Sequence, residues 1–362
     1  MMRITNSMMT QSVIRNINNN MNRLSETQQE ASTGVKIQEA SDDPVAASKT
    51  LKYRGVIAKI EQYQSNAADA TSWMKVTENT LESLTDTVQQ IRDLTSQASS
   101  DILDDTEKEA IAAEVSELKN TVLELMNAQY AGRYIFGGYA TNEAPYTETT
   151  ASYTDATTGE TTTLSTISFK DGYLSLGGVV STSVDSATLL NLYNANSANT
   201  YTSNGSQEIT YNTGYSSQTA VNVEGQDVTG TGTGMLFDTI DKLLLGLEGE
   251  TGYQSVTVDA TTGVASVTTT EFSMDELLDE IDGNLAIIST AASGLGARMN
   301  YVETCSVRLA SDYTTYTGLL SENIDSDISE ATTEYATAQT IYDASLSVGA
   351  KVITKSLVDY LS

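Results

Sequence analysis

A long helical pattern at the end of the chain constrains the fold more than any other feature. Apolar or small residues recur there at alternating spacings of three and four, and no proline interrupts them. These positions are Leu320, Ile324, Ile328, Ala331, Tyr335, Ala338, Tyr342, Ser345, Gly349, Val352 and Ser356. Because many of them hold Ala, Ser or Gly, the helix buries little apolar area per turn and needs partners.

A second, thinner helical pattern lies at the start of the chain. Its spaced positions are Val13, Ile17, Met21, Leu24, Gln28, Ala31 and Val35. We infer that the first and last helices pair, and that neighbouring chains cover what the pair leaves exposed. An ordinary intramolecular bundle closed by its two termini explains the same periodicity and stays open as an alternative.

The charge balance excludes several classes of partner. The chain has 48 acidic and 19 basic residues, a formal net charge of -29. Since each phosphate contact needs a cation, this charge argues against nucleic acid, and it argues equally against an anionic membrane surface. No stretch approaches the ~20 apolar residues of a membrane helix. Because Met1 to Met9 lacks the apolar run of a secretory signal, we expect a chain that is cytosolic or leaves without a cleavable signal.

Residue usage also argues against enzymatic chemistry. Histidine is absent, which removes the commonest general base and the usual zinc ligand. The single cysteine, Cys305, cannot form an intrachain disulfide. We therefore predict no catalytic residue, no cofactor and no metal site.

Helix-start signals divide the two ends of the chain into long helices. Asp43 is a good N-cap and Pro44 suits the first helical position, which predicts a helix of around fifty residues from there. Two sequences with the spacing of a capping box, Thr106 to Glu109 and Ser273 to Glu276, predict two more helix starts. Within the helix that follows Ser273, the sequence Gly294-Leu-Gly296 predicts an interruption or kink.

The centre of the chain has a different composition. From Tyr139 to about Gly234 it is rich in Thr, Ser, Gly, Tyr and Asn, with short alternating runs that indicate strands. The pentapeptide Asp-Ala-Thr-Thr-Gly occurs at 155–159 and again at 259–263, where Asp and Gly suit hairpin turns. Between the two copies, Met235 to Leu247 predicts a compact amphipathic helix.

These patterns predict a mainly α fold with an inserted β region. The N- and C-terminal parts form a long antiparallel helical coiled-coil bundle, with a strand-rich variable domain at its tip. The expected segments are an N-terminal assembly helix (1–40), the N-terminal part of a helical rod domain (41–138), an inserted strand-rich domain (139–234), the C-terminal part of the rod domain with a hairpin near 253–270 (235–318), and a C-terminal assembly helix (319–362).

Short motifs near both ends of the chain are shared with a known family. They are Met2-Arg-Ile-Thr5, Ser32-Thr-Gly34 with Lys36 and Ile37, Ser41-Asp-Asp-Pro-Val45, Gly132-Arg-Tyr-Ile-Phe-Gly-Gly138, Leu295-Gly-Ala-Arg-Met-Asn300, and the ending with Ser345-Leu346, Lys351 and Ser356-Leu-Val-Asp-Tyr-Leu361. Together they resemble the flagellin superfamily over roughly residues 1–145 and 273–362. Flagellins usually continue the Asp-Asp motif with Ala-Ala-Gly, whereas this chain has Pro44-Val-Ala, and its ending resembles that of the hook-associated junction proteins.

The resemblance implies a structural subunit of the bacterial flagellum, not an enzyme, that joins the hook to the flagellin filament. A filament flagellin is the nearest alternative, and a helical secreted effector or adhesin is a more distant one. The family implies assembly through the terminal helices, for which the expected interface residues are Ile17, Met21, Leu24, Ile324, Ile328, Tyr335, Tyr342, Leu346 and Leu357. The expected structural motif residues are Asp42, Asp43, Pro44, Gly132, Phe136, Gly137, Gly138, Gly296 and Arg298.

Partners and location also follow from the resemblance. The implied partners are copies of the chain in a ring or short helical layer, a junction protein on the hook side, flagellin on the filament side, and an export chaperone at the C-terminal helix. Neither nucleic acid nor membrane is expected as a partner. The implied location is the extracellular flagellum at the hook-filament junction, reached by flagellar type III export without a cleavable signal peptide.

Overall fold

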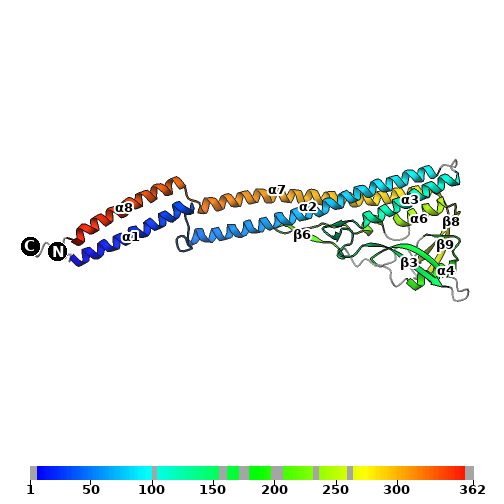
Figure 1. Cartoon of the computed structure of the whole chain (residues 1–362), viewed down its shortest axis with the longest axis horizontal. Coiled ribbons are helices and arrows are strands. Elements are labelled where there is room, and N and C mark those ends of the chain that lie inside the picture. The colour runs from blue at the N-terminus through cyan, green and yellow to red at the C-terminus, as the bar shows by residue number, and fades with distance from the viewer. Residues whose placement is uncertain are drawn as a thin grey trace, which may run out of the picture. The chain divides into compact units, whose positions relative to one another are not determined.

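The structure is a computed structural model that describes residues 6–99, 104–154, 161–170, 179–196, 207–230, 236–258 and 264–354. Most of this chain is helical, with a smaller strand-containing region in the middle of the sequence, which confirms the predicted fold class (Figure 1). It divides into two compact units, Met1–Gln62 with Arg308–Ser362, and Tyr63–Val307. No described helix is long and apolar enough to cross a membrane.

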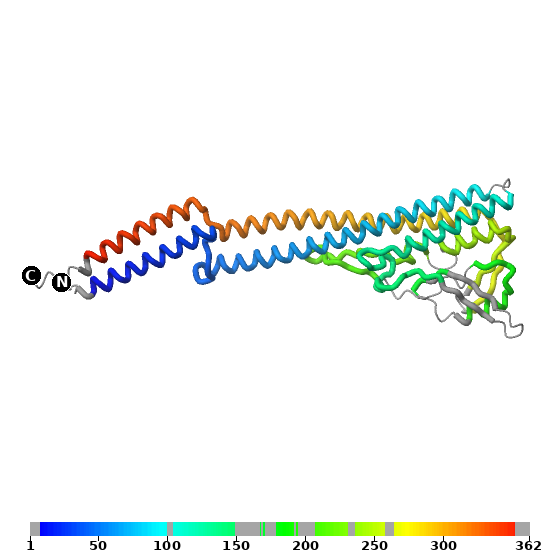
Figure 2. The backbone as a smooth tube through the Cα atoms, viewed as in Figure 1, coloured from blue at the N-terminus to red at the C-terminus, as the bar shows by residue number. Residues whose placement is uncertain are grey.

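The unit formed by the two ends of the chain is helical. Helix α1 (Asn6–Thr33) and helix α8 (Ile328–Thr354) run antiparallel and pack side by side, as the tube in Figure 2 shows in blue and red. The beginning of α2 (Pro44–Ala98) and the end of α7 (Met274–Ile324) complete the unit. The predicted pairing of the first and last helices is therefore confirmed within a single chain.

The predicted helix starts are confirmed at two of three places. Asp43 caps α2, because its Oδ1 accepts from the backbone N–H of Val45 at 2.9 Å and of Ala46 at 3.0 Å. Ser273 Oγ accepts from the Glu276 N–H at 3.4 Å, next to the first residue of α7.

The capping box predicted at Thr106 to Glu109 is wrong by two residues. Helix α3 (Asp105–Met126) starts earlier, and Asp104 and Glu107 form the reciprocal box. Thr106 lies in the first turn, where its hydroxyl donates to Asp104 Oδ1 at 2.6 Å. A carboxylate at the N-cap, favoured by the helix dipole, thus holds the position that the spacing had assigned to Thr106.

Two predictions about the C-terminal helices are also wrong. Gly294 and Gly296 do not interrupt α7, which continues through them to Ile324. The single helix expected over 319–362 is instead broken after Ile324, and α8 starts at Ile328. Asp327 is the reason for the new start, because its Oδ1 accepts from the Ser329 N–H at 2.8 Å and from the Glu330 N–H at 3.4 Å.

The unit Tyr63–Val307 has one hydrophobic core, built mainly from α2, α3, α7 and the short helix α6 (Leu236–Leu247). Fully buried core side chains come from each of these helices: Leu81, Leu84, Val88, Val115, Val122, Leu243, Ile288, Leu295 and Val302. Helix α6 is almost entirely buried, and its bounds match the predicted helix.

Antiparallel hairpins make up the strand-containing part of this unit. Strands β3 (Tyr146–Thr154) and β4 (Thr161–Phe169) pair along their whole length, and β8 (Gly252–Val258) pairs with β9 (Ala265–Glu271). The second pair confirms the hairpin expected near 253–270, although both Asp-Ala-Thr-Thr-Gly sequences lie outside the described residues. The short strand β5 (Val180–Ser181) adds to β8.

Smaller elements complete the unit. Strands β6 (Thr210–Gly214) and β7 (Ser217–Ala220) form a third hairpin, and β1 (Gln129–Tyr130) pairs with β2 (Arg133–Tyr134). The helices α4 (Ser186–Asn196) and α5 (Gln226–Thr229) lie in a region for which the sequence predicted only strands.

Candidate assembly interface

Two helix breaks lie opposite each other in the unit formed by the chain ends. Gly34, with φ of +69°, terminates α1 in the left-handed conformation that glycine adopts readily. The Lys36 N–H donates to the Ile324 carbonyl at 2.7 Å, and the Ser326 N–H donates to the Gly34 carbonyl at 2.8 Å. Ser326 Oγ also donates to Glu30 Oε1 at 2.6 Å. The break after α1 and the break before α8 are therefore hydrogen-bonded to each other.

Side chains of the Ser-Asp-Asp-Pro motif stabilise the connection to α2. Asp42 Oδ2 accepts from the N–H groups of Gln38 at 3.2 Å and Glu39 at 2.9 Å, which closes the turn before the helix. Asp43 provides the cap described above, and Pro44 is the first residue of α2, where its missing N–H needs no partner. The motif residues thus set where α2 begins.

Helices α1 and α8 pack through small side chains. Ala331 and Ala338 are buried on the inner face of α8, and Gly349 is buried near its end. A Cβ placed on Gly349 would come within 2.9 Å of Ile17 Cδ1, so the helices approach closely there. Up to Lys351, where the description of side chains on α8 ends, the buried residues on its inner face are the small Ala331, Ala338 and Gly349, in line with a pair that gains little from its own packing.

The flanks of the same helix pair carry exposed apolar side chains. On α1, apart from Met8 and Met9 near its start, they are Ile14 at 46% and Met21 at 55% exposure, seven residues apart on one face. On α8, Ile341 and Val348 are spaced by seven, at 43% and 57%. The remaining exposed apolar side chains of α8 are Ile328 and Leu346. We call these six side chains the flanking apolar positions.

Charged side chains are sparse on the two helices. Their acidic residues are Glu26, Glu30, Glu330, Glu334 and Asp343, and their basic residues are Arg15, Arg23 and Lys351. Most of the large negative charge of the chain therefore lies elsewhere. Another helix can approach this pair without the strong like-charge repulsion expected from the net charge.

The structure places the expected interface residues in two environments. Ile17, Leu24, Tyr335 and Tyr342 are half-buried, and Ile324 is buried next to the helix break. Met21, Ile328 and Leu346 are exposed and belong to the flanking apolar positions. Leu357 lies outside the described residues.

Three flanking apolar positions were missed from the sequence. Ile14, Ile341 and Val348 fall outside the spacing of the inner seam, so a search for that one seam passes over them. The signal that could have found them is a second repeat of seven, which links Ile14 to Met21 and Ile341 to Val348.

The motif from Gly132 to Gly138 lies in the other unit and is structural. Phe136 is fully buried. A Cβ on Gly137 would meet the carbonyl oxygen of Ala140 at 2.6 Å, so this turn leaves no room for a side chain. Gly132 and Gly138 have φ of +77° and +60°.

Arg298 connects α7 to the segment after the β6–β7 hairpin. Its Nη1 donates to the carbonyl oxygens of Ala220 at 3.3 Å and Asn222 at 3.0 Å. A cavity of about 470 Å³ beside it is lined by the small residues Ala286 and Gly294 and by other side chains of α7. The neighbouring Gly296 has no atom within 4 Å of the place where its Cβ would stand.

Comparison with known proteins agrees with the motifs. Residues 4–141 match the family model of the bacterial flagellin N-terminal helical region, which confirms the resemblance to the flagellin superfamily over that part of the chain. Flagellar hook-associated protein 3 of Escherichia coli (strain K12) is 31% identical over 153 residues, which cover 42% of this chain and 48% of that protein. A flagellin of Clostridium tyrobutyricum is 32% identical over 124 residues, which cover 34% of this chain and 33% of the flagellin. The chain thus spans about half the length of the first of these relatives.

One solved structure has a similar fold. A protein from Vibrio parahaemolyticus, described as a flagellar hook-associated protein, aligns with a TM-score of 0.54 at 17% identity. The alignment covers 78% of this chain and 100% of that chain. At this identity the likeness concerns the fold, and it agrees with the long helices and inserted strands seen here.

Proposed function

Starting from a chain whose residues 4–141 match the flagellin N-terminal helical region, we propose that it is a structural subunit of the bacterial flagellum. Its place is outside the cell at the junction of hook and filament, where it acts as a hook-associated protein. The motif ending in Pro44-Val-Ala and the similarity to flagellar hook-associated protein 3 support this place over one within the filament.

The observation that carries the proposal is the set of flanking apolar positions. An isolated helix pair in water gains nothing from exposing large apolar side chains, and the flanking apolar positions comprise two on α1 and four on α8. Burying each one against a neighbour contributes roughly 1–2 kcal/mol, allowing for partial exposure. The positions lie on the flanks of the pair, so helices of neighbouring copies can pack on either side.

The remaining partners follow from this place. Copies of the chain form a ring or short helical layer, a second junction protein adjoins it on the hook side, and flagellin adjoins it on the filament side. Before assembly, an export chaperone covers the exposed apolar side chains of α8. Export then proceeds through the flagellar type III route.

The second candidate function is that of a filament flagellin. The 32% identity to the flagellin of Clostridium tyrobutyricum favours it specifically. The two candidates differ in one property, because a flagellin propagates its own lattice whereas a junction protein adds a limited layer.

Seeded assembly tests the proposal. Purified chain is mixed with short hook or filament fragments, and growth is followed by light scattering and electron microscopy. A limited layer that stops, and on which added flagellin then grows, is the expected result. Long filaments of this chain alone would establish the flagellin alternative, and failure to bind any fragment would overturn a flagellar role.

Matched variants test the interface itself. Leu346→Glu and Met21→Glu place a charge at two flanking apolar positions and should abolish binding to the fragments. Thr340→Glu places the same charge on an exposed polar position of α8 and should leave binding intact. Equal loss in all three variants would mean that added charge, not the apolar flank, controls assembly.

A further inference from the structure

Helix α6 carries an unusual amount of charge for a buried helix. Asp238 is only 3% exposed and Lys242 only 6% exposed. Asp241 lies one turn from Asp238 on the same face, since residues three apart are neighbours on a helix. Carboxylates are rarely buried this completely unless a cation or several hydrogen bonds compensate them.

The nearby cations pair with other carboxylates. Lys119 of α3 forms an ion pair with Asp241. Lys242 donates to both carboxylate oxygens of Glu280 on α7, at 2.7 and 2.8 Å. Within the described part of the chain, neither lysine forms an ion pair with Asp238.

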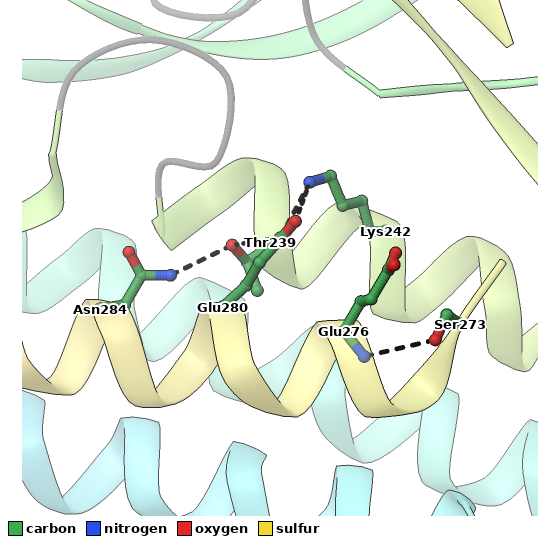
Figure 3. A network of polar contacts seen from close by, with 6 residues as sticks. All are labelled: Thr239, Lys242, Ser273, Glu276, Glu280 and Asn284. Carbon is green, nitrogen blue, oxygen red and sulfur yellow. Dashed lines mark hydrogen bonds and ion pairs between the residues drawn. The ribbon is translucent and has the colours of Figure 1, made fainter. Parts of the chain in front are cut away.

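Hydrogen bonds hold the second ion pair in place. Thr239 Oγ1 donates to Glu280 Oε2 at 3.3 Å and accepts from Asn284 Nδ2 at 3.1 Å. Figure 3 shows the Glu280 carboxylate directed at Lys242 and Thr239, with Asn284 one turn along α7. Both oxygens of Glu280 accept from the Lys242 ammonium group. Lys242 therefore cannot turn to Asp238 without breaking these hydrogen bonds.

The charges around Asp238 therefore do not balance. The groups that act on it are Asp241 and Lys242 from α6, Glu280 from α7 and Lys119 from α3. Glu148 of β3 adds a further negative charge next to Asp241. Three carboxylates share two ammonium groups in the buried cluster, so the carboxylate without an ion pair is the one that gains most from binding a proton.

We propose that Asp238 is a proton-binding site, and that proton uptake as the pH falls below neutrality tightens the docking of α6 against α3 and α7. The neutral carboxylic acid removes a buried charge that no ion pair balances and supplies an O–H donor to the cluster. Above neutrality the Asp238 carboxylate is charged and repels Asp241 and Glu280. This repulsion weakens the docking of α6 against α3 and α7. This inference does not rest on the proposed flagellar role.

The direction of the pH dependence follows from the pKa of Asp238 in the folded chain and in the unfolded chain. Burial, and then the charge of Asp241, raise the pKa of Asp238 from 3.8 to about 7. The stabilisation is fully present below the unfolded value of 3.8 and is lost as the pH rises through about 7. Between these values Asp238 holds a proton in the folded chain but not in the unfolded chain, so this residue by itself makes the unfolding equilibrium constant rise about tenfold per pH unit.

Unfolding by urea between pH 5 and 8 tests this in the full chain. Trp73, the single tryptophan, belongs to the same core cluster as Leu236 and Phe237 of α6 and reports the transition by fluorescence. In the unmodified chain the unfolding constant should rise about tenfold per unit from pH 5 to 6.5 and level off above pH 7. Asp238→Asn should lose this one-proton dependence and be the more stable chain at pH 8.

Asp279→Asn is the matched control, because Asp279 is an exposed aspartate of α7 next to Glu280 in sequence. It should keep the dependence of the unmodified chain. An unchanged slope in Asp238→Asn would overturn the proposal. Should that variant fail to fold, carboxyl ¹³C NMR of the unmodified chain decides: an aspartate that titrates near pH 7 supports the proposal, and midpoints all below pH 5 refute it.

Discussion

Gly349 of α8 lies directly against Ile17 of α1, and a Cβ on the glycine would stand 2.9 Å from Ile17 Cδ1 and 3.3 Å from Val13 Cγ1. A Cβ contact under 3.0 Å essentially never occurs, and one of 3.3 Å is tighter than most. The distance between the two helices at this level is therefore set by the absence of a side chain at residue 349.

The first prediction concerns this contact. Gly349→Leu should force α1 and α8 apart and destabilise their pairing by about 1–3 kcal/mol, in the range of overpacked cores. Hydrogen exchange of the α1 amides measures it, with faster exchange expected over residues 10–24. Ala344→Leu, an exposed substitution on the same helix, is the control. Unchanged exchange in Gly349→Leu would mean that the helices pack elsewhere.

The second prediction concerns Asn323 near the end of α7. Its Nδ2 donates to the Ala46 carbonyl and to Thr50 Oγ1, both at 2.9 Å, which ties α7 to the first turns of α2. Asn323→Leu should lower the free energy of unfolding by about 1–2 kcal/mol, because two acceptors lose their donor. Thermal unfolding followed by circular dichroism gives the change.

A second variant separates the hydrogen bond from side-chain volume at this position. Asn323→Asp keeps the size but cannot donate, so it should be at least as destabilising as Asn323→Leu. A stable Asn323→Asp chain would show that these two hydrogen bonds contribute little.

The third prediction concerns Arg298. Arg298→Met keeps most of the aliphatic stem but removes the donors to Ala220 and Asn222, so the segment after the β6–β7 hairpin should detach from α7. Amide exchange at Ile209 and Val221 should become faster while the core of α3 stays protected. Arg133→Met changes an exposed arginine of the same unit and should have no such effect. Loss of protection throughout α3 would instead indicate a global loss of stability.

The fourth prediction concerns pH and the start of α8. The backbone N–H groups of Ser329 and Glu330 lower the pKa of Asp327 below its usual value of 3.8. The stabilisation is therefore present above pH 3.8 and lost as the pH falls through the lowered value. The protection factors of the amides of residues 328–332, which correct for the intrinsic pH dependence of exchange, should fall as the pH drops through that value. Asn at position 327 still accepts a hydrogen bond but does not titrate, so in Asp327→Asn the protection of these amides should not change as the pH falls. Asp343→Asn is the control and should behave like the unmodified chain.

Long helices were predictable because their signals are redundant. Asp43 and Pro44 mark the start of α2 independently of its periodicity, and Ser273 does the same for α7. The break before α8 was not predictable from spacing, because the seam continues in phase from Ile324 to Ile328. Asp327 was the available signal, since an acid before Ser-Glu is a good N-cap.

Two further errors, the predicted interruption of α7 and the missed helix α4, have causes in packing and in local composition. Two glycines in α7 weaken a helix by about 1 kcal/mol each relative to alanine, but Leu295 between them is fully buried and keeps the turn helical. Helix α4 was missed because the surrounding composition favours strands. Asp185 accepts from the Thr188 N–H at 3.3 Å just before Leu189, a cap signal that composition obscured.

Exposed interface residues were only partly predictable. Met21, Ile328 and Leu346 were expected at an interface because the family assembles through its terminal helices, whereas Ile14, Ile341 and Val348 were not expected. A sequence pattern shows which residues share a helix face, but the face that the chain covers by itself is known only once α1 and α8 are placed together.

The paired helix breaks have a mechanical consequence. With Lys36 bound to the Ile324 carbonyl and Ser326 bound to the Gly34 carbonyl, neither connecting segment can change its backbone angles while the other stays fixed. The two segments are thus joined by a short antiparallel bridge between Val35 and Asp325. Opening either segment must break these hydrogen bonds, so the end of α1 and the start of α8 should loosen together.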